Sequence, residues 1–364
     1  MKSDWKYLFV VYVILLSLES KKWVLGEPKI PCYFIFGDSL VDNGNNNLLI
    51  TTAKANYKPY GIDFPKGATG RFSNGRNLAD FIAEYLKFPN YIPPFKNTRG
   101  FNILQGVNYA SGAAGIRQET GQSQGQVISF DQQLRNHNLI ISRIRRSMGN
   151  NDSATTTYLK RCLYLVGIGS NDYLNNYYMP FSYPTSRLFT PQDYAIVLTQ
   201  QLSSQLKTLY GEGGRKIAVF GLGIIGCTPY ARATFDTQGS PCVENINNAT
   251  QLFNIALKPL IQDLNAKYID AKFTFIDVSQ ISTIQPPNQV QLVSDGPCCE
   301  VQPDKLQCVP FGRVCGNRNG YTFWDGVHPT EVAFEALANR SFNAQFPNDT
   351  YPYDINQLVH LNLQ

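Results

Sequence analysis

The sequence predicts an α/β fold in which a parallel sheet lies between two layers of helices. Short apolar runs rich in β-branched and aromatic residues alternate with longer segments of helical periodicity. The apolar runs are continuously hydrophobic rather than alternating with polar residues, which is typical of strands covered on both faces. No internal repeat, low-complexity tract or linker divides the chain, so we expect one domain over about residues 27–364.

The predicted strands and helices follow one another along the chain. The strand candidates are CYFIFG at 32–37, GVNYA at 106–110, CLYLVGIG at 162–169, KIAVFGL at 216–222 and KFTFIDV at 272–278. The segment 190–213 has Thr190 as its N-cap and ends at two glycines, which indicates a helix. The segment 244–268 repeats apolar residues at helical spacing, and Pro259 is expected to kink it. A last helix is predicted at 330–342.

The composition argues against a nucleic-acid partner. The 364 residues carry a formal net charge of +5 with no basic block. The RIRR sequence at 143–146 lies in an amphipathic stretch and is interpreted as a solvated helix face. Residues 1–26 hold four lysines and two acidic residues, so the remaining chain carries +3, which implies no acidic partner either.

The first 26 residues have the features of a cleaved signal peptide. A weakly basic start precedes an apolar stretch of twelve residues, YLFVVYVILLSL, and small residues follow near Gly26. That stretch is too short to span a bilayer comfortably, and no second apolar segment reaches membrane length, so we expect no stable membrane anchor. Four glycosylation sequons begin at Asn151, Asn248, Asn339 and Asn348. The sequence therefore predicts a secreted glycoprotein.

Eight cysteines are many for a cytosolic enzyme and ordinary for a protein of an oxidising compartment. Cys227 and Cys242 are expected to close a loop, whereas Cys32 and Cys162 start strands and are expected to be buried thiols. The other four lack the paired C-x2-C knuckles of zinc sites, so we expect disulfides there and no metal. These four are Cys298, Cys299, Cys308 and Cys315, and their connectivity is not readable from the sequence.

Three strand ends and one helix start carry the side chains of a candidate active site. Ligands of an open parallel sheet bind beyond the carboxyl ends of its strands. Ser39 follows the first predicted strand, Gly112 the second and Asn171 the third. Asp325 and His328 precede the last predicted helix. Gly112 and Asn171 are placed to donate hydrogen bonds to an oxyanion beside Ser39.

Acyl transfer from an ester needs a nucleophile, a base, a group that orients the base, and donors for the oxyanion. A serine hydroxyl is a poor nucleophile near neutral pH without an imidazole partner. His137 lies in a polar-faced helix and His360 in the C-terminal tail. Only His328 has a carboxylate three residues earlier and a helix behind it. We therefore predict a catalytic set of Ser39, His328 and Asp325.

Several motifs have simpler explanations. The GQSQG motif, which contains Ser123, matches a hydrolase pattern but lies in a polar loop instead of a strand-to-helix turn. The GLGIIG motif at 221–226 resembles a dinucleotide fingerprint, yet Pro229 falls where its helix should continue. Asp38 and Asp172 are interpreted as turn carboxylates that accept backbone N–H groups. Ser39 taken alone would also be explained as a turn residue.

Four ordered blocks closely resemble the plant GDSL esterase/lipase family, within the SGNH hydrolases. The blocks are FIFGDSLVDNGNNN, GVNYASGAAGI, LYLVGIGSNDYLNNY and YTFWDGVHPTE, and the likeness runs from about residue 30 to 345. The resemblance implies a flavodoxin-like three-layer α/β/α sandwich that needs no metal or organic cofactor. It implies that Ser39 is the nucleophile and that the Ser39 N–H, the Gly112 N–H and the Asn171 amide form the oxyanion hole. Asp325 and His328 match the D-x-x-H pair of the family, with His328 acting as base and then as acid.

These observations together predict a secreted serine carboxylester hydrolase that forms an acyl-enzyme. The alternatives are an acyltransferase acting on a lipid or cutin-type polyester at the same site, and a binding protein on an inactive hydrolase scaffold. The expected partner is a small-molecule or lipid acyl ester. The segments 43–100 and 176–190 are expected to shape the acyl pocket, with five tyrosines as candidate walls: Tyr57, Tyr60, Tyr173, Tyr177 and Tyr178. The resemblance implies an extracellular plant protein of the cell wall or apoplast, and the oligomeric state is not indicated.

Overall fold

The computed structural model describes residues 28–98, 103–284, 291–303 and 305–363. The predicted signal peptide at 1–26 lies outside these residues. Within the described ranges, no helix is both long enough and apolar enough to cross a membrane.

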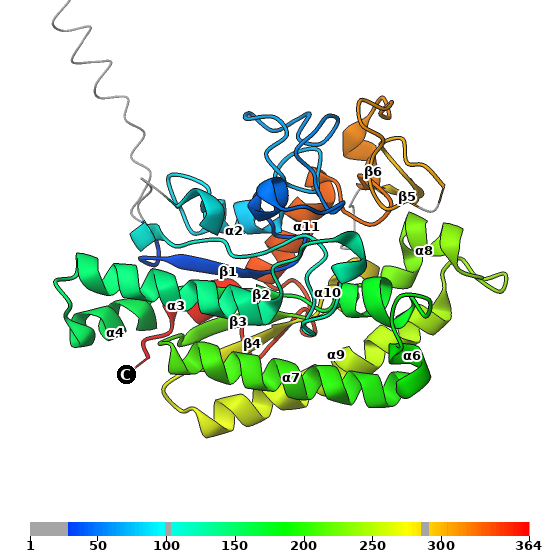
Figure 1. The fold of residues 1–364 in the computed structure, drawn as a ribbon. Coiled ribbons are helices and arrows are strands. Elements are labelled where there is room, and N and C mark those ends of the chain that lie inside the picture. The colour runs from blue at the N-terminus through cyan, green and yellow to red at the C-terminus, as the bar shows by residue number, and fades with distance from the viewer. Residues whose placement is uncertain (1–27, 99–102, 285–290, 304, 364) are drawn as a thin grey trace, which may run out of the picture.

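A mostly parallel sheet forms the middle layer of the molecule (Figure 1). Its strands, in spatial order, are β1 (Tyr33–Gly37), β2 (Leu163–Gly167), β3 (Lys216–Phe220), β4 (Lys272–Ile276) and β7 (Thr350–Tyr351). The first four are parallel, and β7 pairs antiparallel with β4 at one edge. The predicted three-layer α/β/α sandwich is confirmed.

Helices on both faces explain why the strands are hydrophobic throughout. Successive strand side chains point to opposite faces, so Phe34 and Phe36 belong to one core and Tyr33 and Ile35 to the other. The first core is covered by α3 (Phe130–Ser147), α7 (Pro191–Gly211) and α9 (Glu244–Lys267). The second is covered by α2 (Leu78–Tyr85), α11 (Glu331–Phe342) and α12 (Ile355–His360).

The long helices begin where their capping residues predict. The Thr190 hydroxyl accepts a hydrogen bond from the Asp193 N–H at 3.2 Å, and Thr330 caps α11 in the same way. Helix α9 continues through Pro259, so the kink expected there does not break the helix. The shorter helices are α4 (Asp152–Lys160), α5 (Ser170–Asp172), a π-turn (Tyr173–Tyr177), α6 (Thr185–Leu188), α8 (Pro229–Thr234) and α10 (Val278–Thr283). Strands β5 (Val293–Pro297) and β6 (Tyr321–Phe323) form a second, small sheet.

The strand predicted at 106–110 is reduced to a single bridge beside β1. The Ile35 N–H donates to the Val107 carbonyl at 3.1 Å, and the Tyr109 N–H donates to the Ile35 carbonyl at 2.8 Å. The hydrogen bonding continues one step further, where the Ser111 N–H donates to the Gly37 carbonyl at 3.1 Å, and the Asn108 side chain accepts from the Ala110 N–H at 3.0 Å. The segment still runs parallel to β1, so its carboxyl end reaches the same edge of the sheet.

All eight cysteines are paired in the structure. The loop predicted at Cys227 and Cys242 is closed by a disulfide, and the cluster pairs as Cys298–Cys315 and Cys299–Cys308. The expectation of free thiols at Cys32 and Cys162 is wrong, because these two form a disulfide with their Cα atoms 4.7 Å apart. They immediately precede β1 and β2, whose first residues are register partners, so the strand pairing brings the two side chains together.

Candidate active site

The predicted nucleophile stands on a tight turn at the carboxyl end of β1. A Cβ atom on Gly37 would lie 2.3 Å from the Gly167 carbonyl oxygen of β2, so only glycine fits this close approach. The Gln133 side chain holds the Gly37 peptide from α3, accepting from its N–H at 2.9 Å and donating to its carbonyl at 2.8 Å. The turn therefore presents Ser39 at the sheet edge with little freedom.

Ser39, His328 and Asp325 form one hydrogen-bonded chain. The Ser39 Oγ atom lies 2.7 Å from His328 Nε2, and His328 Nδ1 lies 2.7 Å from Asp325 Oδ2. The Asp325 carboxylate is fully buried, and its Oδ1 accepts the N–H groups of Val327 and His328. The Phe72 ring packs on the imidazole, with the two ring centroids 4.8 Å apart.

Asn171 follows β2 and lines a cavity whose wall also includes Ser39 and His328. Its Nδ2 donates to the Ala114 carbonyl at 2.9 Å, and its Oδ1 accepts from Asn175 Nδ2 at 2.6 Å. These two bonds fix the orientation of the amide, and the second Nδ2 hydrogen has no partner among the described residues. The Ser39 N–H likewise donates to no group in the described ranges. Both donors are therefore available beside the serine hydroxyl.

Gly112 lies near the site but its N–H is already engaged. It donates to Asp42 Oδ2 at 3.1 Å, and the carbonyl of Gly112 accepts from the Asn46 side chain. The following residue, Ala113, lines the cavity and has a positive φ of 66°. The segment therefore reaches the cavity at Ala113, while the Gly112 N–H faces a buried carboxylate.

The asparagines that follow the nucleophile are buried donors for the segment carrying Gly112. Asn45 Nδ2 donates to the carbonyls of Asn108 and Ala110, at 3.0 and 2.7 Å. Asn46 Nδ2 donates to the Gly112 carbonyl at 3.0 Å, and its Oδ1 accepts the Ser111 hydroxyl at 2.6 Å. On its outer side this segment makes one β-bridge, between Asn108 and Pro94, where the Phe95 N–H donates to the Asn108 carbonyl at 2.8 Å. The asparagine side chains supply the further donors that its buried carbonyls need. The sequence alone does not indicate this role of the asparagines in the block FIFGDSLVDNGNNN.

Three buried carboxylates surround the site. Burial raises the pKa of Asp38 to about 7, against the opposing effects of the Leu40 N–H and of His328. Burial likewise raises the pKa values of Asp42 and Asp172 to about 6, although each accepts several hydrogen bonds. Asp38 and Asp172 accept backbone N–H groups as predicted, and Asp172 additionally accepts the Thr120 hydroxyl at 2.7 Å.

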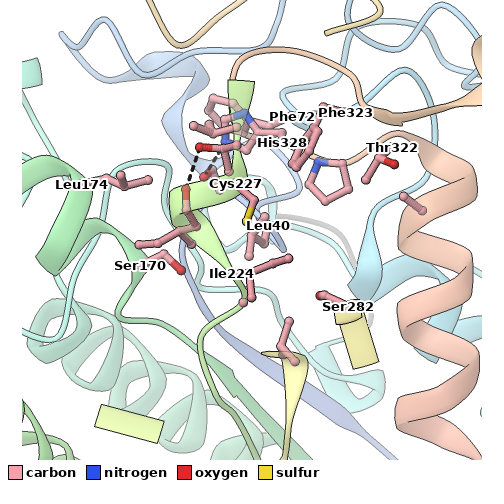
Figure 2. A pocket seen from close by; sticks show the side chains of 18 of the residues that line it. Leu40, Phe72, Ser170, Leu174, Ile224, Cys227, Ser282, Thr322, Phe323 and His328 are labelled. Carbon is pink, nitrogen blue, oxygen red and sulfur yellow. Dashed lines mark hydrogen bonds between the residues drawn. The ribbon is translucent and has the colours of Figure 1, made fainter. Parts of the chain in front are cut away.

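A cavity of about 880 Å³ opens beside Ser39 and His328, with walls that are mostly apolar. In Figure 2, Ile224 and Ser282 lie on the side of the cavity below His328, and Phe323 lies beside the imidazole. The expected tyrosine walls are wrong, because none of the five tyrosines lines the cavity. Much of the wall comes from the segments after β3 and β4, from β6 and from α11. Of the two segments expected to shape the pocket, 43–100 contributes Ala53 and Phe72, whereas no residue of 176–190 lines the cavity. Aromatic residues next to the motifs pack in the protein core. The sequence alone does not distinguish a core position from a position in a pocket wall.

The remaining candidates lie away from this constellation. His137 is fully buried among aromatic rings, with Nδ1 3.0 Å from the Tyr109 hydroxyl, and burial lowers its pKa to about 3. Ser123 lies in an exposed turn. Among the described residues, no three His, Cys, Asp or Glu side chains gather as a metal site would require. The four sequon asparagines, at 151, 248, 339 and 348, are all exposed.

Comparisons with known proteins match most of the chain to one family. The sequence model of the GDSL-like lipase/acylhydrolase family matches residues 33–341. Two Arabidopsis thaliana proteins named GDSL esterase/lipase are each 48% identical to the chain, over 357 and 359 residues. A third, with the same family name and organism, is 44% identical over 357 residues. All three alignments cover 97% of this chain and 98% of the relative.

Proposed function

We propose that this chain, which belongs to the GDSL-like lipase/acylhydrolase family and is an ester hydrolase, acts outside the cell through Ser39, His328 and Asp325. The observation that carries the proposal is the unbroken hydrogen-bonded chain from Ser39 Oγ through His328 to Asp325, at the wall of an apolar cavity. The four disulfides and the plant relatives fit an extracellular protein.

In this mechanism His328 Nε2 takes the proton of Ser39 as the oxygen attacks the ester carbonyl. Asp325 holds the Nδ1–H tautomer and stabilises the imidazolium that forms. His328 then gives its proton to the leaving alcohol, which breaks the ester bond and leaves an acyl group on Ser39. Water attacks this acyl-enzyme with His328 again as base, and the free acid and the serine are released.

The oxyanion of each tetrahedral intermediate needs donors that are fixed in advance. The Ser39 N–H and the second Nδ2 hydrogen of Asn171 supply two that are unoccupied before substrate binds. Gly112 is the third proposed donor, and its N–H has to be shared with the Asp42 carboxylate. The next residue in the chain, Ala113, lines the cavity, so Gly112 lies directly beside the cavity wall.

The cavity suits the acyl part of the substrate. Its volume of about 880 Å³ is at the upper end of the range for small-molecule sites, and its apolar wall favours a hydrocarbon chain. No metal or organic cofactor takes part in the proposed steps. We therefore assign a small-molecule or lipid acyl ester as the substrate.

Ser39→Ala tests the assignment, with Ser123→Ala as the matched control in an exposed loop. On short p-nitrophenyl esters, Ser39→Ala should lower kcat by about a thousandfold or more, while Ser123→Ala should retain wild-type turnover. A fluorophosphonate probe should label wild type and Ser123→Ala but not Ser39→Ala. Undiminished turnover in Ser39→Ala would overturn the mechanism, and alkyl esters formed on adding an alcohol would identify acyl transfer to that alcohol.

A further inference from the structure

We propose that Tyr60 is a positioning residue for the acid–base pair, holding Asp325 in place and limiting how strongly it stabilises the His328 imidazolium. The inference rests on the proposed function of Ser39, His328 and Asp325. It concerns a residue from a segment 265 positions away from Asp325, which no motif of the sequence marks.

The contact is short and lies within the core. The Tyr60 hydroxyl donates to Asp325 Oδ2 at 2.6 Å, and this same oxygen lies 2.7 Å from His328 Nδ1. Both Tyr60 and Asp325 are fully buried. Burial, and then the nearby Asp325 carboxylate, raise the pKa of Tyr60 well above its usual value. The phenol therefore stays protonated and donates to the carboxylate throughout the working pH range.

The Tyr60 hydroxyl is itself held by the disulfide-braced loop. The Cys308 N–H donates to the Tyr60 oxygen at 3.2 Å, so this oxygen accepts one hydrogen bond while donating another. Cys308 is bonded to Cys299, whose N–H donates to the carbonyl of Trp324 at 2.8 Å. The loop thus fixes the phenol and the residue before Asp325 at the same time. An element remote from the sheet thereby sets the orientation of the carboxylate.

The phenol acts electrostatically on the acid–base pair because it donates its hydrogen bond to the negatively charged Asp325 carboxylate. An O–H group donating to a carboxylate draws negative charge toward itself, so less is left to stabilise a proton on the imidazole. Without the phenol hydrogen, Asp325 Oδ2 would have the imidazole as its only partner among the described contacts. The imidazolium would then be better stabilised, and the enzyme would lose its free base at a higher pH.

Tyr60→Phe removes the donor, and Tyr57→Phe is its matched control. Tyr57 packs edge-on against Tyr60 with ring centroids 5.3 Å apart, but its hydroxyl donates to the Cys308 carbonyl at 2.9 Å and not to Asp325. The measurements are kcat and kcat/KM for a short p-nitrophenyl ester across pH 4.5–9. We expect Tyr60→Phe to move the acid limb of the profile upward by about one pH unit and to lower kcat about tenfold. Tyr57→Phe should keep the wild-type limb.

An acid limb at the same pH in Tyr60→Phe as in wild type would overturn the inference, as would an equal shift in Tyr57→Phe. Should Tyr60→Phe fail to fold, site-specific replacement of Tyr60 by 3-fluorotyrosine serves instead. This more acidic phenol donates more strongly and should move the limb to lower pH, and an unmoved limb would again refute the role. Failure of the underlying function is distinguishable, because it would appear as undiminished turnover in Ser39→Ala.

Discussion

Replacing Asn171 by alanine should remove one oxyanion donor and leave the nucleophile in place. The amide is held by two hydrogen bonds, one to the Ala114 carbonyl and one from Asn175, so its free N–H is oriented before substrate arrives. The bond from Ser39 to His328 does not involve Asn171. The variant therefore separates stabilisation of the oxyanion from activation of the serine.

The expected magnitude comes from the number of free donors. The structure offers two unoccupied donors, the Ser39 N–H and the Asn171 amide, so Asn171→Ala removes one of two. Loss of one such donor costs about 2.7–4 kcal/mol of transition-state stabilisation, or about 10²–10³ in kcat. Asn175→Ala removes only an anchor of the amide, so it should cost about tenfold.

The assay is kcat and KM on p-nitrophenyl butyrate for wild type, Asn171→Ala and Asn175→Ala. We expect kcat to be highest in wild type, about tenfold lower in Asn175→Ala and lowest in Asn171→Ala, with KM nearly constant, because the donor acts only once the oxyanion forms. All three proteins should still react with a fluorophosphonate probe and unfold at similar temperatures. A kcat of Asn171→Ala within threefold of wild type, in a folded protein, would refute the assignment of this donor.

Two further predictions concern pH and substrate length. Because burial raises the pKa of Asp38 to about 7, its contribution to stability is present at low pH and lost as pH rises through 7, so Tm should increase from pH 8 to pH 5. Asp38→Asn should flatten that slope in differential scanning calorimetry, and identical slopes would contradict the role of this carboxyl. For substrate length, each methylene buried in the cavity adds about 0.8 kcal/mol, so kcat/KM should rise about fourfold per methylene until the cavity is full. Ile224→Trp narrows the cavity and should shift the preference to shorter acyl chains, and an unchanged series would place the acyl chain elsewhere.

Candidate side chains for the site can be chosen from the sequence because their chemistry limits the choices. Only His328, of three histidines, has a carboxylate three residues before it, and the structure places it 2.7 Å from Ser39. The strands were predictable for a similar reason, since a strand buried on both faces needs apolar residues at every position. These features depend on residues that are close together in the chain, so a local sequence pattern is enough to indicate them.

The features that were missed depend on partners distant in the chain. Pairing of Cys32 with Cys162 follows from the register of β1 and β2, which no local pattern encodes. The bond from Tyr60 to Asp325 joins segments that only the completed fold brings together. The Gly112 N–H is likewise occupied by the Asp42 carboxylate, which is 70 positions away in the chain and is brought close only by the fold.

Ser39 and His328 are separated by 289 positions, and this spacing has a consequence for biosynthesis. The N-terminal part of a growing polypeptide emerges first, so the proposed nucleophile emerges 289 positions ahead of its proposed base. A ribosome-bound chain therefore carries a serine that has no proton acceptor. In the proposed mechanism, hydrolysis therefore cannot begin before the segment that carries His328 has been made and has folded against β1.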